Sequence, residues 1–186
     1  MKIMGIDCSS TTIGWCVLEV DSNITFIDAG YVKPIKTGNI IERLVDTRNK
    51  FKLIIETHKP DSIAVENIIE FMQGKSTAKT IIMLTSFNRM ICLLSYDFLN
   101  KSPELFNVMS IRHGLKLNKV FPKKEDMPEL VAHHLGVTFP YEVSPVRKSS
   151  KPKIAKIKAE NYDKADAIAV ALYYAFLLTG KIKKKK

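Results

Sequence analysis

The chain has 186 residues, which is enough for one domain with a sizeable hydrophobic core. Its 29 Lys and Arg residues exceed its 19 Asp and Glu residues, and the formal net charge of +10 favours a polyanionic partner. Nucleic acid is the first candidate and a membrane surface the second, while a basic solvated surface is the alternative explanation.

Three cysteines, Cys8, Cys16 and Cys92, form neither a CxxC pair nor a Cys/His cluster. The sequence therefore indicates neither a zinc site nor a disulfide framework, which fits a reducing compartment. We expect no signal peptide and no apolar stretch long enough to span a bilayer, and hence no membrane partner and a cytoplasmic protein.

The hydrophobic pattern predicts three strands, followed by strands that alternate with helices. In chain order, strands are expected at 2–7, 14–18, 25–32, 61–66 and 105–109, and helices at 40–58, 76–99, 123–134 and 162–179. Gly38 and Asn39 are start signals for the first helix, and Asn161 is a candidate N-cap of the last. This order predicts an α/β fold with a mixed five-stranded sheet, whose first three strands are antiparallel, and with helices on both faces.

Residues 1–180 are expected to form a single domain. Within it, residues 141–160 contain two prolines and six basic residues against Glu142 and Glu160, so they suit a flexible basic insertion. Residues 181–186 form a basic tail. The expected helix at 76–99 is apolar nearly all round between Ile81 and Leu94, which indicates either a fully buried helix or one shared with a partner subunit.

Four acidic residues are candidates for a metal site. Asp7 and Glu66 each end an apolar strand, and Asp163 and Asp166 lie three apart on one face of the last helix. The structural alternatives to a metal site are that Asp7 caps a turn and that Asp163 and Asp166 complement the helix dipole. Acids that converge at one sheet edge repel one another unless hard cations such as Mg²⁺ bind them. Two such ions can promote phosphodiester hydrolysis, so this pattern in a basic chain predicts a nuclease.

Three motifs resemble the RuvC-type Holliday junction resolvases of the RNase H-like superfamily. They are Gly-Ile-Asp7-x-Ser-x-Thr-x-x-Gly-Trp, then Ile-Ala-Val-Glu66-Asn, and then Asp163-Lys-Ala-Asp166-Ala-Ile-Ala-Val-Ala. The resemblance implies an RNase H-like sheet and a homodimer with the helix at 76–99 in its interface. It also implies paired, metal-dependent hydrolysis of four-way DNA junctions that leaves 5′-phosphates.

The family's catalytic, metal-binding carboxylates map onto Asp7, Glu66, Asp163 and Asp166. The resemblance implies two Mg²⁺ ions per site, with Mn²⁺ as a substitute. Asp7 would then bridge both ions, Glu66 would bind one, and the helix acids would complete the sites. The polar turn after Asp7 replaces the glycine-rich turn of bacterial members, and this divergence, with the Lys/Ile/Asn-rich composition, indicates a phage-encoded relative.

Several residues are candidates for DNA contacts. Phe71 falls where the family places an aromatic residue that stacks on a junction base, and Lys75 is a cation on the same loop. Arg112, His113, Lys123 and Lys124 resemble in position the family's basic residues near the scissile phosphate. The alternatives are a core role for Phe71 and solvated surface positions for the basic residues.

Three competing functions remain at this point. The first is a nuclease of the same fold that prefers forks, flaps or other branched DNA, because substrate choice depends on loops. The second is a fragment of an actin-like ATPase, which also opens with a strand, an aspartate and a phosphate-binding turn. That class needs a second phosphate loop and a longer chain. The third is a catalytically silent nucleic-acid-binding module, which predicts missing carboxylates.

Overall fold

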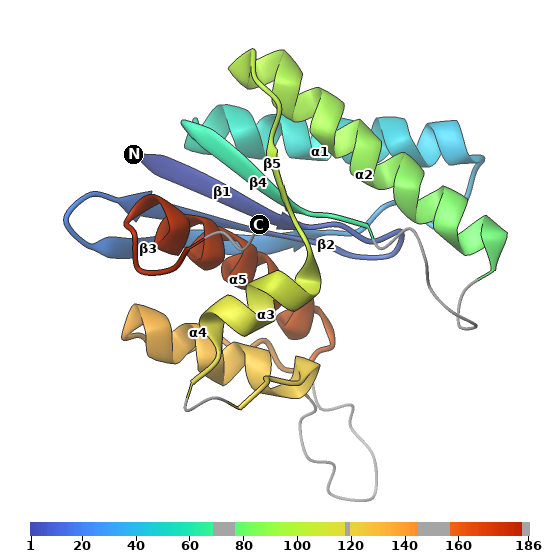
Figure 1. Cartoon of the computed structure of the whole chain (residues 1–186). Coiled ribbons are helices and arrows are strands. Elements are labelled where there is room, and N and C mark those ends of the chain that lie inside the picture. The colour runs from blue at the N-terminus through green and yellow to red at the C-terminus, as the bar shows by residue number, and fades with distance from the viewer. Residues whose placement is uncertain (69–76, 118–119, 145–156, 184–186) are drawn as a thin grey trace, which may run out of the picture.

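The computed structural model describes residues 1–68, 77–117, 120–144 and 157–183 (Figure 1). Its centre is a five-stranded sheet with the strand order β3-β2-β1-β4-β5. The strands are β1 (Lys2–Asp7), β2 (Ile13–Val20), β3 (Ile24–Val32), β4 (Ser62–Glu66) and β5 (Glu104–Phe106). β1, β2 and β3 pair antiparallel, whereas β4 pairs parallel with both β1 and β5. The predicted mixed sheet is therefore confirmed.

Helices cover both faces of the sheet, as predicted (Figure 1). One face carries α1 (Ile40–His58) and α2 (Ala78–Leu99). The other carries α3 (Val108–Leu115), α4 (Met127–Leu135), which follows the 3₁₀ turn η1 (Lys124–Asp126), and α5 (Glu160–Leu178). Side chains alternate across β1, so Ile3 joins the core under α5 while Met4 and Ile6 join the core under α1 and α2.

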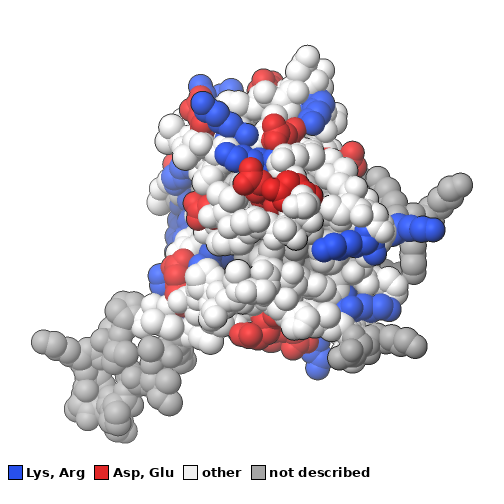
Figure 2. Space-filling model, turned by 90° about the vertical axis from the view of Figure 1, so that its left-hand side faces the viewer, with Lys and Arg blue, Asp and Glu red and all other residues white. Residues whose placement is uncertain are grey.

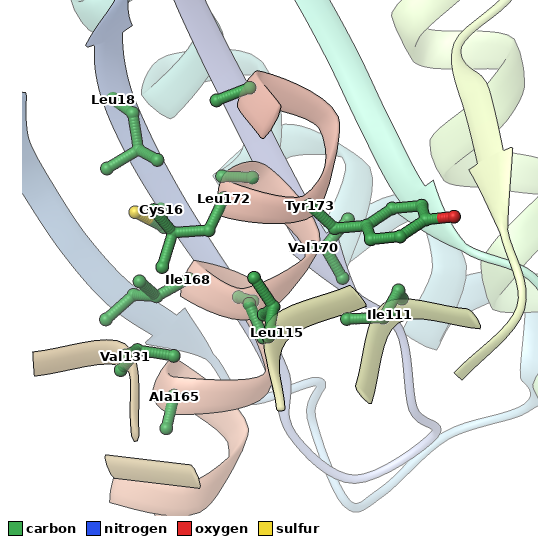
Figure 3. Close-up of a cluster of buried hydrophobic side chains, with 14 of the residues drawn as sticks. Cys16, Leu18, Ile111, Leu115, Val131, Ala165, Ile168, Val170, Leu172 and Tyr173 are labelled. Carbon is green, nitrogen blue, oxygen red and sulfur yellow. The ribbon is translucent and has the colours of Figure 1, made fainter. Parts of the chain in front are cut away.

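α5 is the central helix of its layer, because it lies between the sheet and the two short helices. Figure 3 shows Ile168 and Leu172 of α5 beside Cys16 and Leu18 of β2, with Ile111 and Leu115 of α3 on another side of the helix. Thirteen residues of this 19-residue helix are buried. Such enclosure leaves α5 little freedom to shift relative to β1 and β2.

Most of the expected boundaries agree with the structure, and two of them are wrong. The fifth strand ends at Phe106 rather than at residue 109, and the unpredicted helix α3 follows. Asn107 causes the switch, because its side chain accepts a hydrogen bond from Met109 N at 2.8 Å and caps the new helix. A short apolar run cannot distinguish a strand from a buried helix, so this segment was ambiguous.

The second error concerns the start of α5, which begins at Glu160, before the expected cap. Asn161 is fully buried inside the first turn and bonds other segments: its Nδ2 donates to the carbonyls of Glu142 and Lys158, and its Oδ1 accepts from Glu142 N. The first helix behaves as expected, since Asn39 forms a reciprocal capping box with Glu42 and Gly38 has a φ of +88°.

The ends of the basic segment 141–160 are ordered by an ion-pair cluster. Val143 and Ile157 form an antiparallel bridge, and the Glu142 carboxylate accepts from Lys158 Nζ at 2.9 Å and from Lys164 Nζ at 3.0 Å. These lysines hold the pKa of Glu142 down at about 2. Glu142 is thus an acid outside the four candidates that has a defined structural role.

α2 buries one side only. Phe87, Ile91 and Leu94 face the core, whereas Ile82, Leu93 and Tyr96 are 66%, 64% and 48% exposed. By length and composition α2 could cross a membrane, so the expectation that no stretch is long enough is wrong for this helix. One such helix is weak evidence for a membrane span, and α2 packs against α1 and β4.

The net positive charge of the protein does not make every face of the molecule basic. Figure 2 shows the left-hand side of Figure 1, which is the side at which β1 begins. Acidic and basic residues are interspersed there, and much of the surface is uncharged. This face therefore lacks the continuous basic band that contact with a DNA backbone favours.

Candidate active site

The two strand-end carboxylates meet because β1 and β4 are parallel neighbours at the middle of the sheet. Their register ends with Ile6 opposite Val65, so Asp7 and Glu66 are the next residues of adjacent strands. Carboxyl ends of parallel strands share one edge of a sheet, where open α/β sheets place their functional groups. The sequence predicted both strands, but their pairing and register come from the structure alone.

α5 brings the other two carboxylates to the same edge by approaching the sheet very closely. Gly14, which pairs with Asp7, has no side chain where a Cβ would lie 2.0 Å from the carbonyl oxygen of Asp163. At Gly5 of β1, a Cβ would lie 2.5 Å from the carbonyl oxygen of Ala167. The glycines of the sheet and the alanines of α5 therefore place the first turn of the helix directly beside the end of β1.

The four carboxylates interact strongly in this partly desolvated position. Burial, and then the charges of Glu66 and Asp166, raise the pKa of Asp7 well above its usual range. Burial and the Asp166 charge raise the pKa of Glu66 to about 7, and burial also raises the pKa of Asp166. Raised pKa values mean that the charged forms are disfavoured until a cation compensates them.

Two basic side chains provide part of that compensation. Lys124 Nζ lies 3.3 Å from Asp163 Oδ1 and 3.5 Å from Asp166 Oδ2. Burial lowers the pKa of Lys124, but the charges of Asp166, Asp163 and Asp7 outweigh burial. The pKa is therefore raised overall and the ammonium form is favoured. Arg112 Nη2 lies 3.9 Å from Asp166 Oδ1, and its buried Nε has no hydrogen-bond partner among the described residues. Both residues were expected to contact DNA, and the structure places them among the carboxylates.

The remaining candidates for DNA contacts are placed differently. His113 and Lys123 are exposed, on α3 and immediately before η1 respectively. Phe71 and Lys75 lie outside the described residues. The hydroxyl-rich turn after Asp7 largely satisfies itself, because Ser9 Oγ accepts from the backbone N–H groups of Thr11 at 3.2 Å and Thr12 at 3.0 Å. This turn reverses the chain between β1 and β2.

Sequence analysis missed two residues that hold the surroundings of the site. Arg43 of α1 donates from Nη2 to the Ser10 carbonyl at 2.7 Å and from Nε to the Ile35 carbonyl at 2.9 Å. Asn88 of α2 donates from Nδ2 to the Glu66 carbonyl at 3.0 Å. The available signal for Asn88 was a lone amide in an apolar helical run, and no local pattern pointed to Arg43.

The chemistry of the donor set fits hard divalent cations, which prefer carboxylate oxygens. In the described part of the chain, no three His, Cys, Asp or Glu side chains are already assembled at metal-ligand spacing. The Lys124 ammonium lies within ion-pair distance of both helix carboxylates. Cys8, Cys16 and Cys92 are free thiols in the structure.

Comparison with known proteins identifies the family. The sequence model described as "Crossover junction endodeoxyribonuclease RuvC" matches residues 3–98, which is more than half of the chain. The chain belongs to the RuvC family. It is 28% identical to a RuvC of Campylobacter curvus over 176 residues, covering 94% of this chain and 96% of that protein. A RuvC of Sulfurovum sp. is 32% identical over 80 residues, 42% of this chain and half of that protein.

Solved structures of RuvC-type proteins share this fold. The structure titled "T. thermophilus RuvC in complex with Holliday junction substrate" has a TM-score of 0.70 at 18% identity and covers 97% of this chain and 96% of its own. The yeast mitochondrial Holliday junction resolvase Ydc2 has a TM-score of 0.59 at 14% identity, over 93% of this chain and 77% of its own. The RuvC family and its RNase H-like fold thus agree with the resemblance in the sequence, while a phage origin stays a prediction.

Proposed function

We propose that this protein is a homodimeric, divalent-metal-dependent endonuclease that resolves four-way DNA junctions. The observation that carries the proposal is the convergence of Asp7, Glu66, Asp163 and Asp166 from two strand ends and one helix. Dimer formation and dependence on divalent metal are general properties of the RuvC family. The family assignment sets aside the actin-like ATPase, and the four carboxylates argue against a catalytically silent module.

Asp7, Glu66, Asp163 and Asp166 are the proposed ligands of two Mg²⁺ ions, with Mn²⁺ as a substitute. Ions held there would supply an activated water and stabilise the leaving oxygen. Asp7 would hold an ion together with the other three carboxylates, whose charges all raise its pKa. Hydrolysis by water predicts a 5′-phosphate and a 3′-hydroxyl, ends that a ligase can join.

The basic residues have separate proposed roles. Lys124 and Arg112 compensate the negative charge of the carboxylates, to which the scissile phosphate would add more negative charge. His113, Lys123, Phe71 and Lys75 are proposed contacts to the DNA arms. Electrostatic contacts of this kind are independent of sequence and weaken with added salt. Since the substrate is DNA, the cytoplasm is the expected place of action.

The exposed side of α2 is the proposed subunit interface. Ile82, Leu93 and Tyr96 follow one another at intervals of 11 and 3 residues, so they share one face of the helix. A twofold axis at such a face repeats the same surface on both subunits. Two sites related in this way suit paired nicks across a junction. The same proposal treats residues 1–180 of each subunit as a single domain.

The test is cleavage of synthetic four-way, three-way, flap and linear duplex DNA with Mg²⁺ or Mn²⁺. The wild type should cut the four-way junction by paired nicks, and Asp7→Asn should abolish cutting but retain binding. Full activity of Asp7→Asn would contradict the assignment of the carboxylates. Preferential cutting of flaps with intact four-way junctions would favour the alternative, a broader branched-DNA nuclease with the same metal site.

A further inference from the structure

Asn88 and Ser95 are fully buried polar residues on the inner face of α2, whose other buried residues are apolar. Asn88 Nδ2 donates to the carbonyl oxygen of Glu66 at 3.0 Å, and Asn88 Oδ1 accepts from the Cys92 thiol at 3.7 Å. Burying an amide is unfavourable unless it forms hydrogen bonds, so its partners explain why it is tolerated here. Those partners connect α2 to the residue that ends β4.

The Glu66 carbonyl needs this partner because the sheet does not provide one. Asn67 N donates to the Phe106 carbonyl on the β5 side, so the alternation along β4 directs the Glu66 carbonyl toward β1. The ladder between β1 and β4 ends one residue earlier, at Ile6 and Val65. The Asn88 amide therefore satisfies a backbone acceptor that would otherwise lie beyond the last rung.

We propose that Asn88 is a positioning residue for the catalytic site, acting through Glu66. The inference rests on the proposed function. A hydrogen bond to the Glu66 carbonyl fixes the peptide that carries the Glu66 side chain, and so fixes where its carboxylate lies relative to Asp7. Groups that orient metal ligands from outside commonly change metal affinity or activity about 10- to 100-fold when they are replaced.

The position of Asn88 also relates the site to the proposed subunit interface. α2 exposes Leu93 and Tyr96 on its outer side and holds Glu66 through Asn88 on its inner side. A helix that is fixed by a partner subunit would thus transmit its position to one of the four carboxylates. This connection makes Asn88 more than a core residue.

The main test compares Asn88→Leu with Ser95→Ala. Ser95 is a suitable control because it is fully buried, lies seven residues later on the same face, and donates only to the Ile91 carbonyl of its own helix. For each variant, calorimetry measures Mn²⁺ affinity, gel shift without metal measures junction affinity, and single-turnover cleavage measures rate. Circular dichroism and sedimentation establish that each variant is folded and dimeric.

Asn88→Leu should bind Mn²⁺ about 10-fold more weakly and cut about 10- to 100-fold more slowly, with junction affinity within about twofold of wild type. Ser95→Ala should retain wild-type values of all three. If Asn88→Leu does not fold, Asn88→Ser replaces it, because a helix serine bonds its own helix as Ser95 does and leaves the Glu66 carbonyl without the amide. Asn88→Ser should then show the same changes in the same direction.

Wild-type Mn²⁺ affinity in a folded Asn88 variant would overturn the inference, as would equal losses in Ser95→Ala. Failure of the proposed function gives a different result. In that case the wild type binds Mn²⁺ but cuts no branched DNA, and the difference in Mn²⁺ affinity between Asn88→Leu and Ser95→Ala still decides the role of Asn88.

Discussion

The two faces of the sheet hold the site in different ways. On the α5 face, glycines of β1 and β2 meet backbone atoms of the helix, and two carboxylates come with the helix itself. On the α1 and α2 face, larger side chains such as Phe51 and Phe87 separate the layers, and single polar groups reach the site. Close backbone packing leaves no room for adjustment, whereas a hydrogen-bonded side chain can be lost with a smaller effect.

The difference also concerns what each face leaves uncovered. α5 is almost completely enclosed by the sheet, α3 and α4, as Figure 3 shows for its central turns. α2 leaves a row of large apolar side chains exposed on its outer side. The α5 face therefore acts as the fixed part of the site, and the α2 face offers the surface on which a second subunit can act.

The largest effect is expected from Gly14→Ala on the α5 face. A methyl group 2.0 Å from the Asp163 carbonyl must push α5 from β2, at a cost of about 3 kcal/mol in unfolding free energy. Cleavage should be lost, since Asp163 and Asp166 move with the helix. Urea denaturation and single-turnover assays measure both effects. Gly136→Ala is the control, because nothing lies within 4 Å of that position and only its φ of +66° opposes alanine, costing about 1 kcal/mol. Equal effects at both positions would contradict the close-packing argument.

The second effect is electrostatic and appears without metal. The pKa of Glu66 is about 7 in the folded protein against 4.5 as the ordinary value, so the native state retains a proton that the unfolded state loses. Stability should therefore fall as pH rises between about 4.5 and 7. Glu66→Gln should remove this contribution and be about 3 kcal/mol more stable than wild type at pH 8 in EDTA. Thermal unfolding from pH 5 to 8 tests this, and Mn²⁺ should reverse the order of the two proteins. A wild type that gains stability through this range relative to the variant would refute the prediction.

A smaller effect is expected from Arg43→Met, which removes the guanidinium that joins Ser10 and Ile35. Loss of two hydrogen bonds to backbone carbonyls should lower the free energy of unfolding by about 1–2 kcal/mol. The cleavage rate should fall as well, because the turn after Asp7 loses an anchor. Arg48→Met is the matched control on an exposed position of the same helix and should stay within about 0.5 kcal/mol. Indistinguishable urea curves for the two variants would show that Arg43 does not anchor the turn.

The smallest effect on subunit stability is expected from Leu93→Lys on the outer side of α2. The side chain is already 64% exposed, so the free energy of unfolding of the subunit should change by no more than about 0.5 kcal/mol. Sedimentation equilibrium should nevertheless show a shift from dimer to monomer. Leu178→Lys, at the exposed end of α5, should leave the dimer intact. A Leu93→Lys protein that remains dimeric would place the interface elsewhere.

Much of the fold could be predicted because each element carries its own signal. Alternating apolar runs gave the strands, and Gly38 with Asn39 gave the start of α1. Prediction failed where a residue had a tertiary partner. Asn161 is of a residue type that often caps helices. Its amide instead donates hydrogen bonds to the carbonyls of Glu142 and Lys158, and α5 starts earlier. Lys124 and Arg112 were predicted near the scissile phosphate, and only the tertiary structure shows that they lie beside Asp163 and Asp166.

The sequence by itself determined which carboxylates were candidates, because an acid that ends an apolar strand or lies on an inward helix face is unusual wherever the chain goes. Only the tertiary structure decided that they meet. The parallel register of β1 and β4 makes Asp7 and Glu66 neighbours, and Gly14 admits the first turn of α5 beside them. Both depend on pairings between residues far apart in the chain, which local periodicity does not encode. The same holds for Asn88, whose partner lies 22 residues away.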